Sequence, residues 1–163
     1  MRIVGQILAY AAFAAVLGAL SVWPQYRLLA DGQAIVSLTF SHAGQRIEPC
    51  RRRSQEELDA LPPNMRRPDD CPRARHAIEV QMRLDDELLY SGTQAPSGLW
   101  QDGKATVYTR TTVNAGERQL FVAMNDSGPD SGFDYVLRRE LNIEPGRNVV
   151  ITFDDLRAEF IIE

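Results

Sequence analysis

The sequence predicts a mainly β protein, in which one N-terminal transmembrane helix precedes an immunoglobulin-like antiparallel β-sandwich. A disulfide-stapled loop with a short helix interrupts that domain. Three observations predict this class: an uncharged apolar run over residues 3–23, a hydrophobic period of two from residue 34 onward, and two cysteines that enclose an Arg- and Pro-rich segment. The chain of 163 residues has room for one ordinary domain. We divide it into an anchor (1–27) and an extracytoplasmic domain (28–163), with the stapled loop at 50–71.

The N-terminal run has the length and composition of a membrane-spanning helix. Twenty-one helical residues span about 30 Å, the thickness of the hydrocarbon core of a bilayer. Trp23 and Tyr26 stand where interfacial aromatic residues are expected, and Pro24 ends the helix. The run is longer than the apolar core of a signal peptide and lacks a small-x-small cleavage pattern. We therefore expect a retained anchor, with a cleaved signal as the alternative.

The orientation of this anchor follows from its flanks and from the cysteines. Arg2 lies before the run and Arg27 after it, so the positive-inside bias is weak. A cysteine pair is typical of an oxidising compartment. We expect a single-pass protein of a bacterial inner membrane, with its N-terminus in the cytoplasm and its C-terminal domain in the periplasm.

Small residues recur every four positions along the run. Ala11, Ala15 and Ala19 form one such row, and Ala14 and Gly18 form a second beside it. Residues four apart share a helix face, and small side chains there allow two helices in lipid to approach closely. We interpret the rows either as ordinary alanine content or as a packing face against another membrane protein or a second copy of the chain.

The only cysteines, Cys50 and Cys71, are predicted to form a disulfide. Closing a loop of this size stabilises a fold by about 3 kcal/mol in the chain-entropy model. Within the loop, Ser54 and Glu57 form a capping-box pattern, which predicts a short helix that ends at Pro62.

The cysteines and histidines also permit a metal site. His42 and His76 flank the cysteine pair, and two thiolates with two imidazoles suit tetrahedral zinc or soft copper. The spacing matches no compact zinc-finger pattern, so we rank this site of His42, Cys50, Cys71 and His76 below the disulfide.

The rest of the chain alternates as half-buried strands do. Ile78, Val80, Met82 and Leu84 alternate with polar residues, and turn dipeptides such as Pro145-Gly146 separate the runs. A small β-barrel is the main rival to the sandwich. The expected strands are 36–40, 78–84, 88–90, 105–113, 120–124, 133–141, 148–153 and 158–162.

Three polar or aromatic groups are candidates for binding. An arginine group suits an acidic protein partner or lipid headgroups, or is a solvated face. Asp126, Asp130 and Asp134 suit a hairpin turn or, less well, a hard cation. Trp100 and Tyr108, with Tyr90 and Tyr135, either pack against the core or line a groove. The arginine group is Arg51, Arg52, Arg53, Arg66 and Arg67.

The sequence argues against catalysis and against nucleic-acid binding. It lacks the nucleophile-elbow, P-loop, dinucleotide-binding and zincin motifs, and its net charge is −4. We expect no cofactor. The function that we expect is a membrane-anchored periplasmic accessory or assembly subunit that binds protein partners in a larger membrane complex. The alternative is a periplasmic module that binds copper, zinc or a small ligand.

Overall fold

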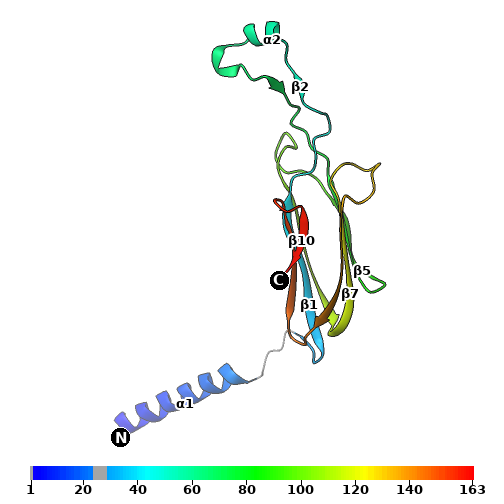
Figure 1. Ribbon diagram of the computed structural model, residues 1–163. Coiled ribbons are helices and arrows are strands. Elements are labelled where there is room, and N and C mark those ends of the chain that lie inside the picture. The colour runs from blue at the N-terminus through cyan, green and yellow to red at the C-terminus, as the bar shows by residue number, and fades with distance from the viewer. Residues whose placement is uncertain (1, 24–28) are drawn as a thin grey trace. The chain divides into compact units, whose positions relative to one another are not determined.

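The computed structural model of the chain describes residues 2–23 and 29–163 (Figure 1). The residues cluster into two compact units, Met1–Ala30 and Asp31–Glu163, and each is described by itself. Strands make up 45% of the described residues, which confirms the prediction of a mainly β protein with one N-terminal apolar helix.

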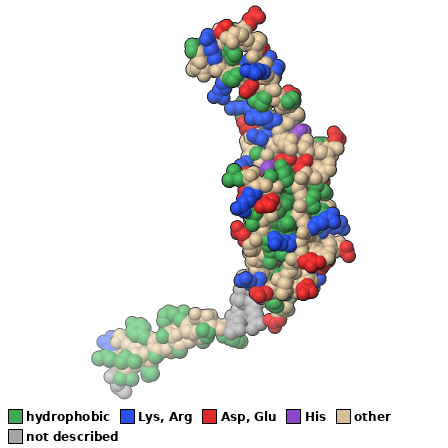
Figure 2. Space-filling model, in the orientation of Figure 1, with side chains coloured by type: hydrophobic (Ala, Val, Ile, Leu, Met, Phe, Trp, Pro, Cys, Tyr) green, Lys and Arg blue, Asp and Glu red, His purple; other side chains and the backbone are tan. Residues whose placement is uncertain are grey.

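The first unit is the helix α1 (Arg2–Val22). It has 21 residues and contains an 18-residue stretch with a mean hydropathy of 2.0, so it is long and apolar enough to cross a membrane. All its side chains are exposed, and Figure 2 shows apolar side chains along its length. A surface of this kind is favourable in lipid and costly in water. Pro24, Tyr26 and Arg27, which bear on the predicted helix end and orientation, lie outside the described residues.

The second unit contains two four-stranded sheets, which Figure 1 shows as two layers. One sheet has the order β10-β9-β1-β6, the other has the order β5-β4-β7-β8, and both contribute to one hydrophobic core. The strands are β1 (Gln33–His42), β4 (Ile78–Leu84), β5 (Glu87–Gln94), β6 (Ala105–Asn114), β7 (Gly116–Asn125), β8 (Tyr135–Ile143), β9 (Asn148–Asp154) and β10 (Glu159–Ile162).

Burial follows the predicted alternation in β4 but not in β1. In β4 the four apolar residues are buried and the polar residues between them point outward. In β1, residues 34–38 are all buried, because this strand lies between β6 and β9 within its sheet. Ser37, a polar residue between the apolar Val36 and Leu38, is 6% exposed and donates a hydrogen bond to Oδ1 of Asn148 at 2.9 Å. That bond offsets the cost of burying its hydroxyl.

The strand connectivity differs from the immunoglobulin pattern. With the eight long strands lettered A to H in chain order, the sheets are HGAD and CBEF, whereas an immunoglobulin constant domain pairs ABED and CFG. One ladder, between β1 and β9, is parallel. The immunoglobulin-like part of the prediction is therefore not confirmed.

The connection between β1 and β4, residues 43–77, is here called the arm. It extends beyond one end of the two sheets (Figure 1). Cys50 and Cys71 form the predicted disulfide, with 4.2 Å between their Cα atoms. Beyond the disulfide the arm contains the two-stranded sheet of β2 (Arg51–Arg52) and β3 (Asp69–Asp70), the helix α2 (Gln55–Asp59) and a 3₁₀ turn at Pro63–Met65.

The arm is held by local contacts and not by a core of its own. The capping box of α2 is present, with Glu57 N donating to Ser54 Oγ at 3.2 Å and Ser54 N donating to Glu57 Oε2 at 2.8 Å. Every residue from 51 to 70 is described, and none of them is buried. The arm thus contributes almost nothing to the hydrophobic stability of the domain.

Candidate functional site

The two ends of the sheet unit carry very different connections. At one end, here the arm end, His42 pairs with Ala105 and Asn125 pairs with Glu79. The β9 strand, parallel to β1, also finishes there. The connections at this end are the arm, residues 95–104, residues 126–134 and residues 155–158. At the other end, here the entry end, where the chain enters β1, the connections are residues 85–86, residue 115 and residues 144–147.

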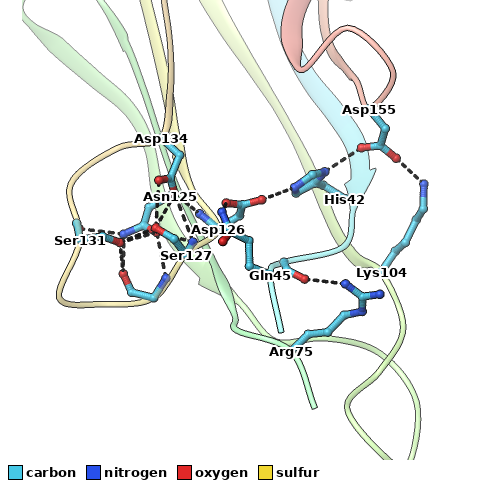
Figure 3. A network of polar contacts seen from close by, with 12 residues as sticks. His42, Gln45, Arg75, Lys104, Asn125, Asp126, Ser127, Ser131, Asp134 and Asp155 are labelled. Atoms are coloured by element: carbon cyan, nitrogen blue, oxygen red, sulfur yellow. Dashed lines mark hydrogen bonds and ion pairs between the residues drawn. The ribbon is translucent and has the colours of Figure 1, made fainter. Parts of the chain in front are cut away.

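His42, the last residue of β1, bridges two of the arm-end connections, residues 126–134 and residues 155–158 (Figure 3). Its Nε2 lies 2.7 Å from Oδ2 of Asp126, and its Nδ1 lies 2.7 Å from Oδ1 of Asp155. Lys104 Nζ donates to Oδ2 of Asp155 at 2.6 Å. Gln45 Nε2 donates to Oδ1 of Asp126 at 2.9 Å. We call these five residues the histidine node.

The node gathers two carboxylates around the His42 ring at the margin of the core. Asp126 is only 3% exposed, and a buried carboxylate is costly unless it is paired. Each ring nitrogen of His42 lies within hydrogen-bond distance of one carboxylate, so the ring bridges Asp126 and Asp155. Burial opposes the ionisation of Asp155, but hydrogen bonds from His42 and Lys104 outweigh it, and the pKa of Asp155 is lowered. The imidazole also packs edge-on against Phe153, with ring centroids 4.9 Å apart.

The base of the arm is fixed to the node by its backbone. Gln45 N donates to the carbonyl of Asp126 at 2.9 Å, and His76 N donates to the carbonyl of Gln45 at 2.9 Å. Arg75 Nη1 donates to the carbonyl of Gly44 at 2.8 Å. The position of Gly44 is too close to the carbonyl of His76 for any Cβ. The two strands of the arm are therefore clamped together where they leave the sheets.

Residues 126–134 form a hydrogen-bonded loop beside the node. Oδ2 of Asp134 accepts bonds from the backbone N–H of Asp126 at 2.8 Å and of Ser127 at 3.1 Å. Burial opposes the ionisation of Asp134, but these bonds outweigh it and lower its pKa. The aspartates singled out in the sequence thus include one that caps the loop. Across residues 2–23 and 29–163, no group of three His, Cys, Asp or Glu side chains is arranged to hold a metal ion.

The residues of the alternative metal site are not brought together as a set. Both sulfur atoms, of Cys50 and Cys71, are used in the disulfide. His42 faces carboxylates in the node, and the ring of His76 lies against Gly128 of the neighbouring loop. A site with two thiolates would require the disulfide to be reduced, so binding of copper or zinc stays a prediction without geometric support.

The five predicted arginines divide into two kinds. Arg51 is paired with Glu57 at 2.9 Å and lies 3.4 Å from Asp70, and Arg53 is paired with Asp70 at 3.0 Å. Arg66 donates to two backbone carbonyls of the arm. Arg52 and Arg67 make no side-chain hydrogen bond or ion pair with any described residue. The arginine group is thus partly a structural ion-pair network, and partly free to meet another molecule.

The remaining candidates are exposed or packed as follows. The helix rows of Ala11, Ala15 and Ala19, and of Ala14 and Gly18, are exposed on α1, so the packing face stays a prediction. Trp100 is 67% exposed and Tyr108 is 69% exposed. Tyr90 and Tyr135 pack against the core. These four aromatic residues do not line one groove.

The arm end also carries exposed apolar side chains that the sequence analysis did not single out. Leu99 is 91% exposed and Leu156 is 97% exposed, and Trp100 lies beside Leu99. The three connections at the entry end contain no large apolar residue. Exposed Trp and Leu at loop tips are costly in water and typical of contact surfaces.

The chain matches no protein-family model and no curated protein sequence.

Proposed function

We propose that the chain is a single-pass, membrane-anchored accessory or assembly subunit whose extracytoplasmic domain binds a protein partner through its arm end. The domain is a β-sandwich in this proposal. The compartment is the periplasm of a bacterium, with α1 in the inner membrane and its N-terminus in the cytoplasm. The disulfide and the apolar helix support an oxidising compartment at a membrane.

One observation carries this proposal. The arm has no buried residue between 51 and 70, and yet it is closed by a disulfide and clamped by hydrogen bonds at its base. A long connection that adds nothing to the core, but is fixed in shape, is best explained by contact with another molecule. Fixing its shape beforehand lowers the entropic cost of binding.

The neighbouring connections strengthen this interpretation. Leu99, Trp100 and Leu156 give the arm end an apolar component, and the arm gives it charge. Interfaces typically combine an apolar centre, often with Trp, and a polar rim. Anchoring by α1 confines the domain to the membrane surface, so a small interface suffices. The rows of small residues on α1 provide a second contact in this proposal.

Gentle detergent extraction, affinity purification and size measurement test the proposal. We expect the full-length chain to migrate in a complex of constant composition. The double variant Leu99→Ser/Trp100→Ser should reduce recovery of the partner several-fold, whereas Tyr108→Ser, an equally exposed aromatic on a sheet face, should not. A full-length chain that migrates alone as a monomer contradicts the proposal.

A further inference from the structure

A hollow of about 530 Å³ lies on the arm beside the disulfide. Four arginines line it, together with two aspartates, and Figure 2 shows basic side chains gathered on the arm and near its base. The lining therefore has a surplus of two positive charges. The charged residues are Arg46, Arg53, Arg67, Arg73, Asp69 and Asp70.

The antiparallel course of the arm brings these side chains together. Arg51 pairs with Asp70 and Arg52 pairs with Asp69 in the ladder of β2 and β3. Closer to the sheets, the disulfide and an isolated antiparallel β-bridge between the backbones of Arg46 and Arg75 hold the same two strands together. Two of the lining arginines come from the outgoing strand and two from the returning strand, so the hollow exists only while both are held together.

The contacts within the hollow leave most of the positive charge without a carboxylate. Asp70 is shared by Arg51, at 3.4 Å, and Arg53, at 3.0 Å. Arg46 donates to a neutral acceptor, the carbonyl of Pro72, at 2.8 Å. Arg73 lies 3.8 Å from Asp102, the long limit of an ion pair.

The two remaining charged groups of the lining are Arg67 and Asp69. Within the described part of the chain, the Arg67 guanidinium has no partner, and no guanidinium pairs with the Asp69 carboxylate. Arg46, Arg67 and Arg73 thus present three weakly neutralised guanidinium groups against one unpaired carboxylate. Such a surplus attracts anions and repels cations.

We propose that this hollow binds an oxyanion of two negative charges, a phosphate monoester or inorganic phosphate. The planar fork of a guanidinium donates two parallel hydrogen bonds to a phosphate, and several forks surround a tetrahedral anion. A divalent anion also balances the surplus of two charges, which a single carboxylate does not. The phosphate comes either from solution or from a lipid headgroup. This site does not depend on the partner proposed above.

Titration of the full-length protein in neutral detergent tests the site. One probe is inorganic phosphate and the other is short-chain phosphatidic acid, each followed by calorimetry. We expect one saturable site per chain, whose affinity falls with rising salt. Binding of phosphatidic acid alone assigns the site to a lipid headgroup, and binding of both with similar affinity assigns it to the phosphate itself.

A pair of matched double variants decides whether the hollow is responsible. Arg67→Gln/Arg73→Gln removes one unpaired arginine and one held at 3.8 Å. Arg52→Gln/Arg157→Gln removes the same charge outside the hollow, again one unpaired arginine and one held at 3.8 Å, by Asp154. We expect the first to weaken binding about tenfold or more and the second less than about twofold, since charge-assisted bonds are local.

A variant that conserves charge separates the effect of the guanidinium forks from the effect of charge alone. Arg67→Lys/Arg73→Lys keeps the charge and loses the forks, and we expect it to bind more weakly than the wild type and more tightly than the glutamine variant. Equal weakening by the two glutamine double variants, or no saturable binding of either probe to the wild type, would overturn the proposal.

Discussion

The sheets and the arm belong to one unit but are stabilised by different forces. The sheets enclose a core in which Leu38, Val80 and Val122 are fully buried, and burial of such side chains supplies most of the stability of a domain. The arm has no buried residue between 51 and 70, and relies on one disulfide, a capping box and exposed ion pairs. The sheets thus supply most of the stability of the fold, whereas the arm adds little to it.

The histidine node lies where these two regions meet. It connects the last residue of β1 to the loops of two hairpins and to the base of the arm. Its polar contacts are partly buried, which makes them stronger and more costly to break than contacts on the arm. We therefore expect substitutions in the sheets, the arm and the node to change the stability of the protein by different amounts and in different regions.

The largest effect is expected in the core. Leu38→Ala should lower the free energy of unfolding by about 2–5 kcal/mol, because it removes buried methyl groups and leaves a cavity. Leu156→Ala is the matched control, since Leu156 is 97% exposed at the arm end, and it should change stability by less than about 0.5 kcal/mol. Thermal or denaturant unfolding of the full chain in detergent measures both. Similar losses of stability for the two variants would show that the core of the sheets is not the main source of stability.

Removal of the disulfide should destabilise the arm and leave the sheets unchanged. Cys50→Ser/Cys71→Ser should lower the local stability of residues 51–70 by about 3 kcal/mol, because the unfolded segment gains conformational entropy when its loop is no longer closed. Hydrogen exchange should show faster exchange in the arm and unchanged protection in β4 and β7. Reduction of the wild type with a thiol should give the same pattern. Loss of protection in β4 and β7 as well would mean that the arm and the sheets unfold as one.

The node should have an intermediate effect. His42→Leu removes one hydrogen-bond partner from the buried carboxylate of Asp126, to which Gln45 still donates, and should cost about 1–3 kcal/mol. Lys104→Met removes only an exposed ion pair with Asp155, and should cost less than about 1 kcal/mol. Both are measured by denaturant unfolding. A larger loss for Lys104→Met than for His42→Leu would show that the node is not held by the histidine.

The smallest effect is the pH dependence of the loops at the arm end. The pKa values of Asp134 and Asp155 are lowered in the folded chain from an ordinary value of 3.8. Carboxylates of this kind stabilise the fold above their unfolded pKa, and that stabilisation is lost as the pH falls through the folded value. Stability should therefore decline below about pH 4.

A variant of one of these carboxylates tests the cause of that decline. Asp134→Asn should be less stable than the wild type at neutral pH and should lose less stability on acidification. Asp130→Asn is the control, because Asp130 is exposed on the same loop and accepts no side-chain hydrogen bond from any described residue. Melting temperatures measured across the acid range compare the three proteins. Parallel curves for Asp134→Asn and the wild type would exclude Asp134 as a source of the pH dependence.

Features encoded locally could be predicted from the sequence. The apolar helix, the disulfide, the capping box of Ser54 and Glu57, and the alternation in β4 each depend on residues close in the chain or on a cysteine pair without competitors. Strand limits were less accurate. The segment expected at 88–90 is β5, which spans Glu87–Gln94, because its polar residues 91–94 are held by pairing with β4.

Features set by long-range register could not be predicted. The contact of His42 with Asp155 joins residues 113 positions apart and exists only because β1 and β9 run parallel. The burial of Ser37 likewise depends on which strands flank β1. The sequence offered His42 only as a ligand of the alternative metal site, whereas its polar neighbours in space are carboxylates. The hollow of the arm also combines Arg46 and Arg73, which lie outside the predicted arginine group.

In the proposed function, the arm end binds a protein partner and the entry end does not. A photo-crosslinking residue placed at Met65 or Trp100 on the arm end, and at Glu144 on the entry end, tests it in intact membranes of the native cell. All three positions are exposed, so labelling is comparable. We predict one protein adduct of constant mass from Met65 and Trp100 and none from Glu144. Adducts from Glu144 alone, or none from any position, would contradict the proposal that the arm end binds a protein partner.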